Sequence, residues 1–184
     1  MTPTKHIIQS FGIFAAAITF YGLFYSLNDA LIQSLDELPG ASLFRLSSGI
    51  KLVLVLLLGW LGSAAIAVFC FVWTVLYIFP DDWLLSAEVA MAAGLVPLMV
   101  CHWFEQYVMP DLSGLNWQRL FTLSLCYAAL NSVVRAAIVT LHQPSADLAQ
   151  HMFRLFCTDV LGIFAALYAL RLLLQHIDLS RPQS

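Results

Sequence analysis

Charged residues are scarce in this 184-residue sequence, and no cluster of basic residues occurs in it. Asp, Glu, Lys and Arg make up 10% of the chain, whereas a water-soluble domain usually carries about a quarter. The formal net charge is -3, so the chain lacks the basic surface that nucleic-acid binding requires. We therefore expect no nucleic-acid partner.

Motifs for metal binding, disulfide bonding and catalysis are also missing. The four cysteines lie in apolar segments without C-x-x-C spacing, which predicts neither a zinc site nor a disulfide framework. There is no G-x-S-x-G, no H-E-x-x-H and no glycine-rich phosphate loop. We predict a non-enzymatic protein without metal or cofactor. The enzymatic alternative is a membrane-embedded hydrolase or transferase.

Hydrophobic residues dominate instead, at 61% of the chain with a mean hydropathy of +0.85. A transmembrane helix needs about 20 mostly apolar residues, and the sequence supplies enough for several. We predict an all-α, polytopic membrane helix bundle that forms a single integral membrane domain over residues 1–184, in contact with the lipid bilayer. Its six predicted transmembrane helices cover residues 7–31, 44–60, 63–79, 83–107, 117–142 and 148–177.

The apolar run from Phe44 to Phe79 is too long for one span. A single helix there would measure about 54 Å, against a hydrocarbon core of about 30 Å. We predict a tight reversal over residues 59–63, where Gly59 and Gly62 provide backbone freedom. Asp81 and Asp82 follow Pro80, and their acidity is typical of a helix N-terminus.

Loop charges predict how the chain is oriented. With the N-terminus inside, the inner segments carry Lys5, Arg119, Arg171 and Arg181, and the outer loops are acidic. We therefore expect both termini in the cytoplasm of a bacterium and the chain in its inner membrane. Trp60, Trp83, Trp103 and Trp117 fit an aromatic belt at the interfaces, and Trp73 does not.

Several charged and polar residues interrupt the predicted spans at similar depth in the outer half. An ionisable group in hydrocarbon costs at least about 2.5–3.5 kcal/mol on insertion scales, so these side chains should point inward. Ser47, Ser48 and Lys51 share one face of their helix by i, i+3 and i+4 spacing. The candidate ligand-binding residues are Lys51, Glu88, Asn131, Arg135, Asp159, Arg154, Ser47 and Ser48.

Three interpretations of these residues are open. In the first, two cations (Lys51 and Arg135) face two acids (Glu88 and Asp159) in a network that sets helix register. In the second, the residues line an outward-facing pocket for a small solute, with Arg135 as a bidentate ligand for carboxylate or phosphate. The third is a proton relay through Glu88 and Asp159. Asp29 could belong to this cluster or sit at the interface, and we favour the interface. His142 could sense pH or bind metal, and we favour a solvated helix end.

The stretch from Leu46 to Trp60, LSSGIKLVLVLLLGW, resembles the second helix of the MASE1 family of bacterial membrane sensor domains. The resemblance covers residues 43–68, with Lys51 in place of the family's small apolar residue. It implies sensing within the membrane, with output delegated to a separate membrane or cytoplasmic signalling protein.

These observations favour a protein that recognises a small polar or anionic solute as a sensor or signalling component. One alternative is a small-solute transporter or its substrate-binding subunit, because the architecture resembles the substrate-binding subunit of energy-coupling-factor vitamin transporters. Another is a structural scaffold whose charges only hold its helices in register.

Overall fold

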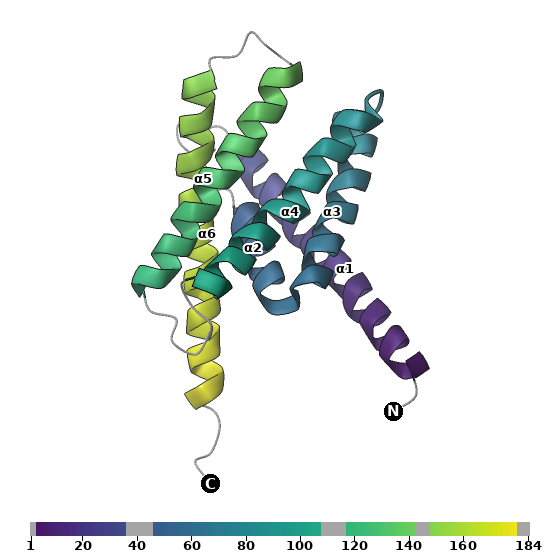
Figure 1. The fold of residues 1–184 in the computed structure, drawn as a ribbon, viewed down its shortest axis with the longest axis vertical. Helices are drawn as coiled ribbons and strands as arrows, with labels where there is room; N and C mark the ends of the chain where they lie inside the picture. The colour runs from purple at the N-terminus through teal and green to yellow at the C-terminus, as the bar shows by residue number, and fades with distance from the viewer. Residues whose placement is uncertain (1–2, 36–45, 108–116, 143–147, 180–184) are drawn as a thin grey trace.

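The computed structural model describes residues 3–35, 46–107, 117–142 and 148–179, and every regular element in these ranges is a helix. The elements are arranged as one bundle (Figure 1). They are α1 (Pro3–Leu35), α2 (Leu46–Leu58), α3 (Trp60–Trp73), the π-helical η2 (Thr74–Ile78), α4 (Trp83–Tyr107), α5 (Trp117–His142) and α6 (Leu148–Leu179). The predicted all-α bundle is confirmed.

Long apolar runs between turn residues mark most helix boundaries correctly. α4 and α5 have the predicted bounds, and α6 ends at Leu179 rather than at residue 177. α1 extends beyond both ends of the predicted 7–31. The predicted helix over 63–79 instead begins at Trp60 and changes to π geometry at Thr74.

The reversal between α2 and α3 depends on Gly59 alone. Its φ is +55°, a left-handed conformation that disfavours any residue with a side chain. Gly62, which the sequence analysis assigned to the turn, is instead buried inside α3. A Cβ there would lie 2.5 Å from the Leu54 carbonyl oxygen. Gly62 therefore lets α3 approach α2 closely, and its predicted role in the reversal is wrong.

The π-helical segment η2 begins where Thr74 competes for backbone acceptors. Its hydroxyl donates to the carbonyl of Cys70 at 2.7 Å and to that of Phe71 at 3.1 Å. The Phe79 N–H then bonds to the Thr74 carbonyl at 2.7 Å, one residue further back than in an α-helix. Pro80 follows and disfavours helical geometry at Phe79, so the helix ends there.

The start of α4 is capped as its acidic residues predict. The Asp82 Oδ1 accepts a hydrogen bond of 2.9 Å from the Leu85 N–H, one of the donors that a helix start leaves unpaired. Asp81 and Asp82 also complement the positive end of the helix dipole.

Among the residues that the structure describes, five helical segments are long and apolar enough to cross a membrane: Ile8–Ala30, Trp60–Ile78, Trp83–Tyr107, Gln118–His142 and Met152–Leu172. Their outward faces carry exposed apolar side chains such as Phe11, Leu23 and Phe153, as expected of lipid-facing surfaces. The chain is a multi-pass membrane protein. α2 has 13 residues and is about 20 Å long, so the sixth complete span stays a prediction.

Small residues bring the helices of the bundle into close contact. A Cβ on Gly49 of α2 would lie 2.5 Å from both the Ala166 Cβ and the Gly162 carbonyl oxygen of α6. A Cβ on Gly94 of α4 would likewise lie 2.8 Å from the Ser63 carbonyl oxygen of α3. Small residues at these positions therefore let the helix backbones approach closely.

The first turn of α1 and the last turn of α6 lie at the same end of the bundle (Figure 1). That both ends of the chain lie on one side of the membrane stays a prediction, as does the cytoplasmic location of that side.

Candidate functional site

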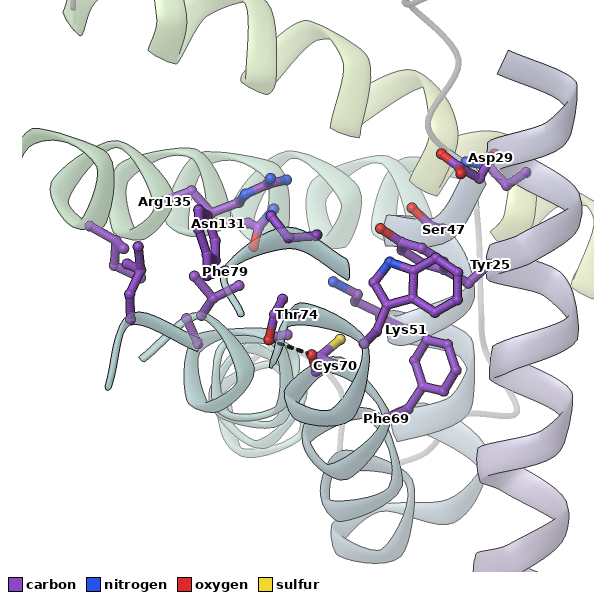
Figure 2. A pocket seen from close by; sticks show the side chains of 18 of the residues that line it. Tyr25, Asp29, Ser47, Lys51, Phe69, Cys70, Thr74, Phe79, Asn131 and Arg135 are labelled. Carbon is purple, nitrogen blue, oxygen red and sulfur yellow. Dashed lines mark hydrogen bonds between the residues drawn. The ribbon is translucent and has the colours of Figure 1, made fainter. Parts of the chain in front are cut away.

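A cavity of about 410 Å³ is lined by residues toward the end of the bundle opposite the first turn of α1 and the last turn of α6, and Figure 2 shows its side chains from close by. Small-molecule pockets typically measure about 300–1,000 Å³, so this cavity has room for a ligand. The lining residues come from α1, α2, α3, η2, α4 and α5. In each element they lie in the portion nearer this end of the bundle. A solute here would therefore contact most of the bundle at once.

Two cations reach this cavity from different helices. Lys51 comes from the middle of α2 and Arg135 from the second half of α5, and both are half-buried (Figure 2). Ser47 lines the cavity one turn before Lys51, and Asn131 one turn before Arg135, because i and i+4 residues share a helix face. Four of the eight candidate residues are therefore brought together.

Arg135 is the better placed of the two cations to bind a ligand. Within the part of the chain that the structure describes, its guanidinium makes no hydrogen bond or ion pair. Arginine offers a planar fork of donors that suits a carboxylate, and it stays charged in proteins. The Asn131 amide lies beside it and lines the same wall.

Another part of the cavity wall is aromatic. Trp73 of α3 stacks on Phe69 with ring centroids 5.9 Å apart and planes 20° apart. Tyr25 of α1 meets Trp73 edge to face at 5.3 Å, and all three side chains line the cavity together with Phe79. Trp73, the tryptophan that does not fit the predicted aromatic belt, is thus a cavity residue.

Asp159 lies beneath the cavity and is fully buried. Its Oδ1 accepts a hydrogen bond of 2.8 Å from the Ser48 hydroxyl of α2, and its Oδ2 accepts one from the Asn131 amide of α5. This carboxylate from α6 therefore links three helices. Ser48 is one residue from Ser47 and about 100° further around α2, so it faces α6 instead of the cavity.

Glu88 and Arg154, two of the predicted ligand-binding residues, do not line the cavity. Glu88 does not line the cavity, and its Oε2 lies 3.9 Å from Nε2 of His142, which does line it. Both side chains are about a third exposed. Their contact lies at the edge of the site, and it is an ion pair only when His142 is protonated. Arg154 is exposed on α6 and does not line the cavity. Glu88 and Asp159 are therefore not among the residues that line the cavity with the two cations, and the predicted pairing of two cations with two acids stays a prediction.

Sequence reasoning missed Asp29 and the aromatic wall. Asp29 lines the cavity from α1, one turn after Tyr25, although we placed it at the interface. The i, i+4 pairs Tyr25 with Asp29 and Phe69 with Trp73 were a usable signal, because each pair shares a helix face. Aromatic residues are frequent throughout the chain, so this signal does not stand out.

A polar stripe on α5 continues from the cavity into the bundle. Arg135, Asn131 and Tyr127 follow one another at four-residue spacing. The Tyr127 hydroxyl is buried and has no hydrogen-bond partner among the described residues. The same is true of the Ser86 hydroxyl in α4. Buried hydroxyl groups usually have a partner, so unpartnered ones mark places where water or a ligand is expected.

No family model, no curated protein and no solved structure matches this chain.

Proposed function

We propose that this protein recognises a small polar or anionic solute in the cavity between α1 and α5, and that it acts as a sensor or signalling component of the bacterial inner membrane. The observation that carries the proposal is the convergence of Lys51 and Arg135 from separate helices on one cavity of about 410 Å³. A charge placed within a membrane bundle is costly unless it is paired or faces water or a ligand.

An anion at this site gains more than it would in water. The surrounding helices lower the local dielectric, so a charge-assisted hydrogen bond from Arg135 is stronger than one in bulk solvent. Lys51 adds a second positive charge from the facing helix, and the Asn131 amide adds a neutral donor. Together these groups select a negatively charged solute.

A sensing role follows from how the cavity is built. Helices α1 to α5 all contribute to its wall, so a solute that binds one arrangement of these helices more tightly will shift the population toward it. The π-helical η2 is part of the wall, and such segments are frequent at functional sites. The resemblance to the MASE1 family supports the same role, with output through a separate signalling protein.

Transport is the second candidate, and the polar stripe on α5 favours it. A route through the bundle needs polar groups below the cavity, and the buried Tyr127 hydroxyl lies one turn beyond Asn131. A transporter predicts solute accumulation in proteoliposomes that contain the protein, with or without a partner ATPase. A sensor predicts none.

Solute binding is tested with detergent-purified protein in a thermal-shift screen against pooled metabolites. A ligand at 100 times its Kd stabilises the folded protein by about 2.7 kcal/mol, which is readily measured. We expect at least one anionic pool to raise the Tm of the wild type and not that of Arg135→Ala. Arg119→Ala is the matched control, because Arg119 is exposed near the opposite end of the same helix.

If every pool leaves the wild-type Tm unchanged, or if Arg135→Ala responds as the wild type does, the proposal is wrong. A strongly destabilised Arg135→Ala together with no response to any pool would instead support a purely structural role for the charge.

A further inference from the structure

The cavity has two chemically different walls, and their combination specifies more than an anion. Arg135 and Asn131 line the cavity from α5, whereas Phe69 and Trp73 line it from α3. Figure 2 shows the α5 pair and Phe69 in separate parts of the cavity. A simple inorganic anion would leave the aromatic wall without a contact. The two walls together suit a ligand with a charged end and a planar apolar body.

The aromatic wall is centred on Trp73, which has aromatic neighbours on either side. Trp73 is held between Phe69, stacked at 5.9 Å, and Tyr77, whose ring centroid lies 4.5 Å away. Tyr25 closes one side edge to face. These contacts hold the indole in place, and Trp73 remains only partly buried because it borders the cavity. A planar ring gains about 0.5–1.5 kcal/mol from such an aromatic partner beyond its buried area.

The charges that line the cavity favour a single negative charge on the ligand. Among the described lining residues, the cations Lys51 and Arg135 and the acid Asp29 sum to a formal +1, because two positive charges less one negative leave one. A dianion would bring a second negative charge next to Asp29, with the Asp159 carboxylate beneath the same wall. Like charges in a site of low dielectric repel strongly.

We propose that the solute is an aromatic monocarboxylate, with its carboxylate on the Arg135 guanidinium and its ring against Trp73. This inference rests on the proposed function and specifies the class of its solute. The carboxylate forms a bidentate pair with the guanidinium, and the ring displaces water from the aromatic wall.

Three probes that differ in their charge or in their ring test this assignment by isothermal titration calorimetry on purified protein. Indole-3-acetate carries both features, indole-3-acetamide lacks the charge, and cyclohexylacetate lacks the aromatic ring. We expect indole-3-acetate to bind at least about tenfold more tightly than the acetamide, because a charge-assisted hydrogen bond contributes about 1.5–3 kcal/mol. We expect cyclohexylacetate to bind about two- to tenfold more weakly, because it loses the ring contact.

Substitutions in each wall then show which residues cause the preference for a ring and which cause the preference for a carboxylate. Trp73→Leu should bring indole-3-acetate and cyclohexylacetate to equal affinity, while Trp73→Phe keeps part of the difference. Trp103→Leu is the matched control, since Trp103 is exposed on α4 and does not line the cavity. Arg135→Gln should bring the acetate and the acetamide to equal affinity. A loss of ring selectivity is a readout that a merely structural tryptophan would not produce.

The inference is overturned if wild-type protein binds cyclohexylacetate as tightly as indole-3-acetate, or binds none of the three probes. This comparison needs no variant, so a misfolded Trp73→Leu does not affect it. The proposed function fails separately, when no metabolite pool stabilises the protein in an Arg135-dependent way.

Discussion

The Asp159 carboxylate accepts hydrogen bonds from two other helices, so its removal tests what holds α2, α5 and α6 together. Asp159→Ala removes the acceptor of both bonds and leaves two buried donors, the Ser48 hydroxyl and the Asn131 amide, without their partner. An unsatisfied buried donor is costly, because neither lipid nor packed side chains replace the lost bond.

The expected loss follows from the number and kind of these bonds. Side-chain hydrogen bonds between membrane helices average about 0.6 kcal/mol, and the largest reach about 1.7 kcal/mol. Two such bonds give a loss of about 1–3 kcal/mol for Asp159→Ala. Removing a buried carboxylate also removes its desolvation cost, which keeps the net loss toward the lower part of this range.

The free energy of unfolding in mixed micelles, titrated with a denaturing detergent, measures this loss. Arg154→Ala is the control, because Arg154 is exposed on the same helix and should change stability by no more than about 0.5 kcal/mol. Asp159→Asn keeps one acceptor oxygen, so it should lose less than Asp159→Ala. In a cycle with Ser48→Ala, the two changes should be non-additive by at least about 0.5 kcal/mol.

Two outcomes would refute this reasoning. One is an Asp159→Ala protein as stable as Arg154→Ala. The other is strict additivity of Ser48→Ala and Asp159→Ala, which would mean that the two side chains do not stabilise the bundle through their shared bond.

The remaining predictions concern helix packing and the edge of the site. Gly49→Ala should destabilise the bundle by about 1–3 kcal/mol, because its Cβ would lie 2.5 Å from α6. Gly12→Ala should be neutral or stabilising, since nothing lies within 4 Å of its Cβ; unfolding titrations that rank the two alike would contradict the packing argument. The Glu88 and His142 side chains are about a third exposed, so their double-mutant cycle should give a coupling below about 1 kcal/mol even when the histidine is protonated. A larger coupling in the same titrations at acidic pH would mean that this pair holds α4 and α5 together.

The helix order could be predicted because hydropathy and turn residues act locally. α4 is the apolar run from Trp83 to Tyr107 and α5 the one from Trp117 to His142, and turn residues flank both runs in the sequence, so their bounds follow from composition. The reversal at Gly59 was predicted from the thickness of a bilayer. The π-helical η2 was not predicted, because its geometry depends on which carbonyls the Thr74 hydroxyl reaches.

The candidate site was only partly predictable. Ser47 with Lys51, and Asn131 with Arg135, were placed correctly on shared faces, since spacing along one helix fixes which residues point the same way. Asp29 and Trp73 were misjudged because each is one of many similar residues. Nothing in their local sequence shows that their helices bring them to the same cavity.

The amino-acid sequence by itself determined that the chain inserts into a membrane as apolar helices, and that charged residues interrupt those helices on defined faces. Only the tertiary structure decided that Lys51 and Arg135 share a cavity while Asp159 bonds to Ser48 and Asn131 beneath it. The physical reason is that spacing sets directions within one helix, whereas the rotation of one helix against another is set by contacts distant in sequence. The approach of Gly49 to Gly162 is one such contact.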